Sequence, residues 1–332
     1  MKMPVLGFGT ARFLLASFVA ASHLWVDMTQ GYAAYAVWAF FVLSGFLMTL
    51  ILTTKYGFNG EGLRSYAFNR FMRIFPLYWI AALMGLCTLW YYGGVGIDLR
   101  SLNGEFYMPF GWENWLHVAT LFPGFSHNGL LVPVSNALSI EVGFYLLLPL
   151  LATSRGAAAF GLVLGMLINL KIGVLPETFA TRYATFLPCL LPFAVGALIC
   201  QFRDELQRFS MPRLSSGVWL AHGVLWYAFP SWPWHWGLYF SLLLSAWCVV
   251  SLYRQSTGKL DRVLGDMSYP IYLVHTTVAA WFVCACGINR EFSFFAIAFP
   301  ATLLISWLIV VLIDRPLSRL KLKPPAQPLS PR

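Results

Sequence analysis

Residues 32–53 read YAAYAVWAFFVLSGFLMTLILT, which is 22 residues without a charged side chain. About 20 apolar residues in a row can cross the hydrocarbon core of a bilayer as a helix. The rest of the chain resembles this stretch in composition, because 59% of its 332 residues are hydrophobic and only 11% are charged, against about 25% charged residues in a typical soluble domain. So few charges cannot cover a soluble globule of this size, and the high hydrophobicity argues against a disordered chain. The composition therefore predicts a polytopic membrane protein and excludes a cytosolic enzyme.

Ten apolar segments predict transmembrane helices, because lipid offers no partner for unpaired backbone groups. They cover residues 5–25, 32–53, 73–92, 137–154, 156–173, 183–201, 215–230, 233–253, 267–287 and 292–313. The predicted fold is all-α, with a transmembrane domain over residues 1–320 and a cytosolic proline-rich tail over residues 321–332. All six cysteines lie inside the apolar segments without metal-ligand spacing, so they are expected to pack, and no metal site is predicted.

The distribution of lysine and arginine orients the predicted helices. With the N-terminus in the cytosol, 17 of the 22 basic residues lie on the inner side and 4 on the outer side, while Arg12 lies within the first span. Cytosolic loops carry such an excess, which predicts an even number of spans and cytosolic termini. The net charge of +9 then reflects loop placement rather than a nucleic-acid partner. A cleavable signal peptide is the alternative for residues 1–25, but Arg12 would interrupt its apolar core.

The outer loop over residues 93–136 is long, aromatic and interrupted by proline. Long loops are usually functional lids or disordered segments, and the aromatic content argues against disorder. Tryptophan and tyrosine also gather at the membrane interface. The sequence is compatible with two roles for this loop, a lid over a site or part of the aromatic belt at the membrane interface.

Ionisable groups inside a span are expensive and are candidate functional residues. The first span carries Arg12 and His23, eleven residues apart. This spacing is roughly 16 Å of helical rise and places both side chains on one stripe of the helix. A fixed cation at one depth and an imidazole at another suit a substrate passage. In the alternative reading, Arg12 extends to the inner interface and His23 touches the outer one.

Glu141 is the only acidic residue inside a predicted span, about one turn below the outer surface and near the expected depth of His23. A buried carboxylate needs a partner. The sequence therefore predicts that Glu141 pairs with His23 and orients it as a general base. The alternative is a glutamate that is hydrogen-bonded to neighbouring hydroxyls such as that of Ser139.

Two further groups of polar residues accompany the spans. Arg70 and Arg73 share a helix face where the chain enters the third span. They are suited to clamping phosphate groups, or they serve only as topology charges. Ser268, Tyr272 and His275 form one polar stripe in the ninth span, which faces a cavity or serves as packing between helices.

Six blocks of sequence, in order, resemble the integral-membrane acyltransferase family 3. They are Arg12 to His23, FFVLSGFL (40–47), RFMRIFP (70–76), LSIE (138–141) followed by Phe144-Tyr145, LGDMSYPIYLVH (264–275) and DRP (314–316). The chain departs from the family pattern at Asn136-Ala137, where Trp-Ser is frequent, and at Asp314, where glutamate is usual. The first departure concerns the expected acceptor contacts, and the second is conservative.

The resemblance implies a ten-helix bundle with cytosolic termini that moves an acyl group, commonly acetyl from acetyl-CoA, onto a hydroxyl. The implied catalytic residues are His23, as general base, and Glu141. The donor is expected to bind along Arg12, Arg70 and Arg73. Four further residues are expected to line the donor channel or to stabilise the oxyanion, namely Ser44, Tyr269, Tyr272 and His275. Direct transfer is the simpler expectation, and an acyl-enzyme through Ser44 or His275 stays open.

The expected partners are acyl-CoA, a carbohydrate or lipid-linked glycan acceptor and the lipids of a bacterial inner membrane, with no metal and no nucleic acid. A transporter or flippase for a glycolipid or small anion would fit the composition almost as well. The absence of a visible internal repeat and the six blocks argue against it. A purely structural membrane partner would leave Arg12, His23 and Glu141 unexplained.

Overall fold

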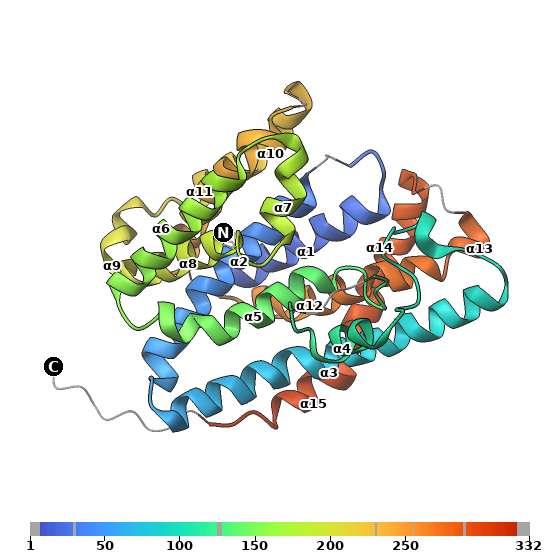
Figure 1. Ribbon diagram of the computed structural model, residues 1–332, viewed down its shortest axis with the longest axis horizontal. Coiled ribbons are helices and arrows are strands. Elements are labelled where there is room, and N and C mark those ends of the chain that lie inside the picture. Colours follow the sequence, from blue (N-terminus) through green and yellow to red (C-terminus); the bar gives the residue numbers. More distant parts are fainter. Residues whose placement is uncertain are drawn as a thin grey trace.

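The computed structural model describes residues 7–28, 31–124, 128–229, 231–255, 257–287 and 290–323. Over these ranges the chain is mostly helical and contains no strand (Figure 1). The α-helices are α1 (Phe8–Leu24), α2 (Tyr32–Ile51), α3 (Gly60–Gly94), α4 (Trp112–Thr120), α5 (Ser135–Leu151), α6 (Arg155–Ile172), α7 (Phe179–Ala184), α8 (Leu190–Gln201), α9 (Arg203–Leu206), α10 (Pro212–Ala228), α11 (Leu238–Leu252), α12 (Lys259–Ala280), α13 (Val283–Cys286), α14 (Phe292–Ile309) and α15 (Arg315–Ser318). Most of the predicted tail, residues 324–332, lies outside the described residues.

Each of the ten predicted segments coincides with helix, which confirms the all-α prediction. Three segments differ in extent. The segment 267–287 is divided between α12, which already begins at Lys259, and α13. The segment 73–92 is the second part of the longer α3, which begins at Gly60 because the Asn59 side chain accepts a hydrogen bond from the Gly62 N–H (2.8 Å). The segment 183–201 is divided between α7 and α8, because the chain leaves the helix around Pro188, whose ring nitrogen carries no hydrogen to donate.

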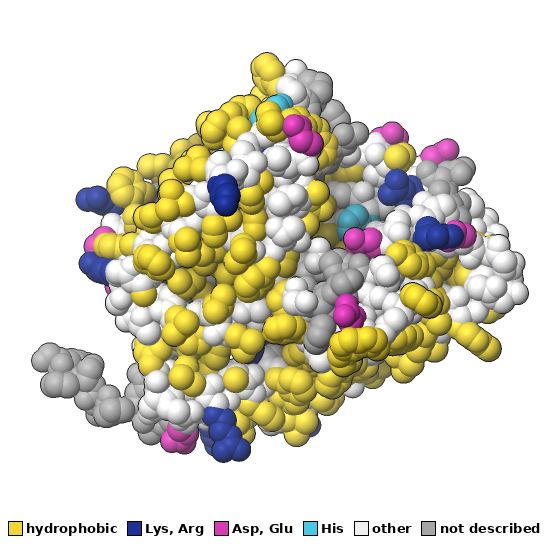
Figure 2. Space-filling view, in the orientation of Figure 1, with side chains coloured by type: hydrophobic (Ala, Val, Ile, Leu, Met, Phe, Trp, Pro, Cys, Tyr) yellow, Lys and Arg dark blue, Asp and Glu magenta, His cyan; other side chains and the backbone are white. Residues whose placement is uncertain are grey.

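Among the described residues, 5 helical stretches have the length and hydropathy to cross a membrane. They are Tyr32–Tyr56, Gly60–Gly94, Arg155–Ile172, Pro233–Leu252 and Phe292–Ser318. The helices α1, α5 and α8 are apolar but shorter. Hydrophobic side chains cover much of the face seen in Figure 2, and large ones such as Leu146, Phe160 and Leu243 are more than half exposed. A surface of this kind is suited to contact with lipid rather than water.

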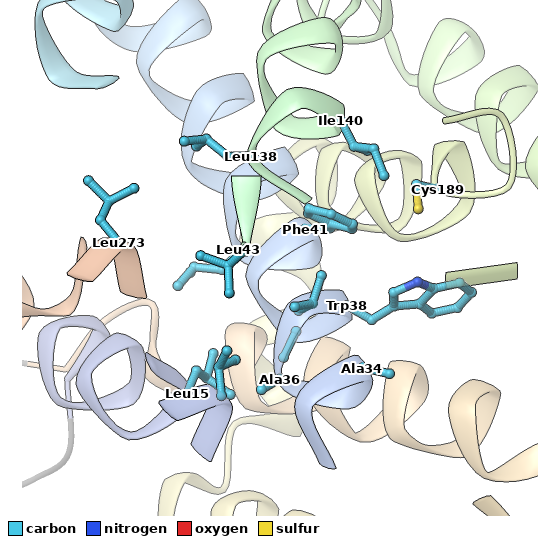
Figure 3. Packing of buried hydrophobic residues seen from close by; sticks show 14 of the residues in the cluster. Leu15, Ala34, Ala36, Trp38, Phe41, Leu43, Leu138, Ile140, Cys189 and Leu273 are labelled. Atoms are coloured by element: carbon cyan, nitrogen blue, oxygen red, sulfur yellow. The ribbon is translucent and has the colours of Figure 1, made fainter. Parts of the chain in front are cut away.

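Helix α2 lies at the centre of the packing. It contacts α1, α5, α8 and α11, and most of its side chains are buried. Figure 3 shows Trp38, Phe41 and Leu43 of this helix beside Leu138 of α5 and Cys189, which precedes α8. The apolar character of α2 on all sides therefore reflects a helix enclosed by other helices.

Two glycines allow α2 and α8 to approach closely. A Cβ atom added at Gly45 of α2 would lie 2.3 Å from the carbonyl oxygen of Phe193, and one added at Gly196 of α8 would lie 2.1 Å from that of Val42. Small residues bring helix backbones together where lipid provides no hydrophobic drive for association. The contact between α2 and α8 consequently depends on the missing side chains.

We expect Gly45→Ala to lower the thermal midpoint of the detergent-solubilised protein, because the added methyl group meets backbone that must shift. Overpacking of this kind costs about 1–3 kcal/mol. Gly217→Ala on α10 is the matched control, since its added Cβ meets nothing within 4 Å while the gain in helix propensity is the same. Equal melting temperatures for the two variants would contradict this account of the α2–α8 contact.

Helices α1 and α12 pack side by side in parallel, with Gly9 close to Gly265 at one end. The Asp261 carboxylate accepts hydrogen bonds from the Gly9 N–H (3.2 Å), the Thr10 N–H (2.7 Å) and the Thr10 hydroxyl (2.7 Å). The first N–H groups of a helix lack partners within it and favour negative charge. Asp261 therefore caps α1 from a neighbouring helix and sets the register in which the two helices pair.

We expect Asp261→Ala to lower the free energy of unfolding by about 1–2 kcal/mol at neutral pH, as the loss of a helix cap does. Burial raises the pKa of the Asp261 carboxyl, but the hydrogen bonds from Thr10 and Gly9 outweigh it and hold the pKa below its usual range. Because the pKa of Asp261 is lower in the folded state, its ionised carboxylate stabilises the fold at pH values above the pKa that it has in the unfolded chain. This stabilisation is lost as the pH falls through the pKa of the folded state. The difference between wild type and variant should thus shrink in acid, measured by thermal unfolding in detergent. A difference that stays constant through the acid range would show that the carboxylate charge is not involved.

Candidate active site

Helices α1, α2, α3, α5 and α12 line a partly open cavity with a volume of about 120 Å³. Seven of the nine residues predicted for the site line it. They are Arg12, Ser44, Arg70, Arg73, Glu141, Tyr269 and Tyr272. The structure therefore brings together side chains from five helices that are far apart in sequence.

The three arginines of the cavity differ in their partners. Arg73 forms a salt bridge with Asp314 (Nη1 to Oδ2, 3.2 Å), and its guanidinium lies 5.8 Å from the centre of the Tyr269 ring. Arg12 and Arg70 each have a buried Nε atom without a hydrogen-bond partner, and neither forms a salt bridge within the described part of the chain. Leaving a guanidinium N–H buried without a partner is costly. The cavity is thus electrostatically suited to an anionic ligand.

Glu141 has other partners than the predicted one. Its Oε1 atom accepts hydrogen bonds from the Ser44 hydroxyl (2.5 Å) and from the Tyr145 hydroxyl. The predicted pairing of Glu141 with His23 is wrong, because α5 packs on α2 and α3 while His23 is paired with α12. The alternative of neighbouring hydroxyls is closer to the structure, but Ser139 is not one of them, since its hydroxyl donates to the Asn136 carbonyl (2.7 Å).

His23 pairs instead with His275 of α12. The His23 Nδ1 atom lies 2.9 Å from the His275 Nε2 atom, and the two rings are stacked with centroids 5.1 Å apart. The His275 Nδ1 atom lies 3.1 Å from the Ile271 carbonyl oxygen, which can only accept. In the neutral pair, His275 therefore donates from Nδ1 and accepts at Nε2, and His23 donates from Nδ1. This leaves the lone pair of His23 at Nε2, where it can accept a proton from a substrate.

The histidine pair lies just beyond the cavity. Neither histidine is among the lining residues, and the place of His275 along the donor channel or at the oxyanion stays a prediction. Tyr272 does line the cavity, and its ring centroid is 6.5 Å from that of His275. His275 thus lies about one helical turn beyond Tyr272 on α12, whereas Tyr269, the ring that Arg73 contacts, lies in the opposite direction along the helix.

The tyrosines and the polar stripe of α12 make separate contacts. Tyr269 donates to the Ile74 carbonyl (3.0 Å), Tyr272 to the Val134 carbonyl (2.9 Å) and Ser268 to the Gly265 carbonyl (2.7 Å). With their hydroxyls engaged by the backbone, the two tyrosines contribute mainly ring surface to the cavity. Ser268 and Tyr272 of the predicted stripe line the cavity. Within the described part of the chain, no hydrogen bond joins the side chains of Ser268, Tyr272 and His275 to one another.

The outer loop reaches the cavity at its end, because Val134 is the residue that accepts from Tyr272. Earlier in the loop, α4 is tied to α3 by the Trp79 indole N–H, which donates to the Ala119 carbonyl (3.0 Å). The loop therefore has structure of its own and packs on the bundle. The choice between lid and interfacial belt stays a prediction.

Sequence reasoning missed two partners in the site. Tyr145 stands four residues after Glu141, and side chains at this spacing are neighbours on a helix, so it could have been found. Asp314 appeared only within the DRP block, and nothing local indicates that it contacts Arg73, which is 241 positions away in sequence.

A comparison with protein families matches residues 6–311 to a family model described as "Acyltransferase domain". Comparisons with curated proteins and with solved structures found no match to the chain. The matched range contains every residue that lines the cavity and both histidines of the pair, whereas Asp314 lies just after it.

Proposed function

The chain belongs to the membrane acyltransferase family 3, and from this premise we propose that it transfers an acyl group, in the first place acetyl, from acyl-CoA to a hydroxyl group. The proposed acceptor is a carbohydrate or a lipid-linked glycan. The proposed setting is a bacterial inner membrane, with ten helices crossing it and both termini in the cytosol.

The main support for this proposal is that the arginines lie at one end of the cavity and the histidine pair lies beyond its other end. Arg12 and Arg70 are partly buried at the cavity, and their Nε atoms have no hydrogen-bond partner among the described residues. Such guanidinium groups suit the phosphate groups of coenzyme A. The histidine pair lies beyond Tyr272 at the other end. Arg12 and His23 are separated by roughly 16 Å along α1, a span that the extended pantetheine arm can bridge.

In the proposed reaction, the acceptor hydroxyl attacks the thioester carbonyl while its proton passes to the His23 Nε2 atom. The tetrahedral intermediate then releases the CoA thiolate, which takes the proton back from His23. The His275 Nε2 atom holds His23 in the required tautomer through the 2.9 Å hydrogen bond. General-base assistance of this kind contributes about 10²–10⁴-fold to a rate.

Glu141 takes a positioning role in this mechanism. Its hydrogen bond from Ser44 connects α5 to α2, and its contact with Tyr145 on the same helix fixes the orientation of the carboxylate. Direct transfer needs no covalent intermediate on Ser44 or His275. A stable acyl-protein species after incubation with labelled donor would favour the two-step alternative instead.

The test is thioester consumption by the purified protein in lipid nanodiscs. With radiolabelled acetyl-CoA, we expect release of free CoA thiol that rises when a soluble sugar acceptor is added. His23→Ala serves as the blank, since it lacks the proposed base. A protein that moves a glycolipid across vesicles without consuming the thioester would be the transporter of the competing proposal.

A further inference from the structure

The chain following α15 returns to the arginine end of the cavity. Asn69 of α3 is buried and makes a two-way contact with the backbone of Leu322: its Oδ1 accepts from the Leu322 N–H (2.8 Å), and its Nδ2 donates to the Leu322 carbonyl (2.9 Å). The same Nδ2 lies 2.8 Å from the Tyr56 hydroxyl. Asn69 immediately precedes Arg70. The contact therefore holds the segment 321–323 against the turn of α3 that carries Arg70 and Arg73.

This clamp holds Lys321 among charged groups of the site. Lys321 is half-buried. Burial lowers the pKa of its ammonium, and Arg73 and Arg70 lower it further, while Asp314 and Asp266 raise it. A third cation beside two arginines is unfavourable unless an anion balances them. Of the two carboxylates that act on Lys321, Asp314 already forms a salt bridge with Arg73, and Asp266 alone does not balance three cations.

We propose that Lys321 is a further phosphate-binding residue for the acyl-CoA donor and that the Asn69–Leu322 contact positions it. This inference rests on the proposed function, because it assigns Lys321 to the nucleotide end of the same donor. Lys321 lies outside the range matched to the family. Lys321 is not among the lining residues, but the contact of Leu322 with Asn69 places it beside the turn of α3 that carries Arg70, where its ammonium can supply a further point charge. Asn69 acts through Lys321 and is a positioning residue.

The experiment is calorimetry of coenzyme A binding to the full-length protein in nanodiscs. We expect Lys321→Gln to raise the Kd for CoA by about 3- to 10-fold, because one charge-assisted contact to phosphate is lost. The Kd of Lys321→Arg should stay near that of the wild type. Lys323→Gln is the matched control, because it removes the same charge from an exposed side chain two residues further on. Asn69→Ala should weaken binding by a similar factor, and the double variant with Lys321→Gln should be scarcely weaker than either single one.

The outcomes separate this inference from the function on which it rests. Unchanged CoA binding in Lys321→Gln, or an equal loss in Lys323→Gln, would overturn the role of Lys321 and leave the acyl-CoA donor intact. If the wild-type protein itself bound no CoA, the assignment of acyl-CoA as the donor would be wrong, and the role of Lys321 would fall with it. A loss in Asn69→Ala that multiplies independently with that of Lys321→Gln would show that Asn69 does not act through the lysine.

Discussion

Replacement of His23 by alanine is expected to lower kcat by about 10²–10⁴-fold, the usual contribution of a general base. The physical reason is the free Nε2 lone pair of His23, which the hydrogen bond to His275 leaves available next to the cavity. The measurement is turnover of acetyl-CoA per folded protein, with folding checked by size-exclusion chromatography and thermal unfolding. Retention of more than about a tenth of wild-type turnover would remove His23 from the role of base.

His275 provides the accompanying control for this role. His275→Leu removes the acceptor that holds His23 in its tautomer, and we expect a clear loss in kcat. His275→Gln should retain more activity, because its amide oxygen can accept in place of the imidazole Nε2. Adding either change to His23→Ala should cost little more, since residues that act as a unit are not additive. Independent multiplication of the two effects would place His275 in a separate function.

The helices and the members of the site could be predicted from the sequence because both leave local signals. A span shows as an apolar run, and an ionisable side chain inside it is rare enough to attract attention. By this reasoning Arg12 and Glu141 were expected in the site, whereas Arg70 was expected from its spacing with Arg73 at the entry to the third span; all three line the cavity. The division between α7 and α8 was missed because the single Pro188 in an apolar run does not show whether the helix kinks or ends there.

The pairings within the site could not be predicted, because they depend on which helices are neighbours. Sequence indicated that Glu141 and His23 share a depth, and depth alone made them candidates for a pair. In the structure α1 lies against α12 and α2, so that His23 meets His275 and Glu141 meets Ser44. The order of helices around the bundle is a long-range property, and apolar periodicity carries no information on it.

The two arginines of α3 should respond differently to the same substitution, although they share one sequence motif. Arg70→Ala removes a guanidinium that has no salt-bridge partner among the described residues, so the folded protein loses no ion pair. Arg73→Ala leaves Asp314 buried without its cation. Removing one member of a buried pair is destabilising. We therefore expect the thermal midpoint to fall in Arg73→Ala and to change little in Arg70→Ala.

In binding, Arg70→Ala should raise the KM for acyl-CoA by about 10- to 100-fold, since hydrogen bonds to a charged group contribute about 1.5–3 kcal/mol. The value of kcat should change much less, because the proposed contact of Arg70 is with the nucleotide end of the donor and not with the reacting atoms. Arg70→Lys should recover only part of the affinity, because an ammonium cannot form the two parallel hydrogen bonds of a guanidinium. Steady-state kinetics and CoA calorimetry on the same preparations separate these effects. Normal CoA affinity in Arg70→Ala would reduce this arginine to a topology charge, because a buried cation that contacts the donor cannot be removed without a loss in binding.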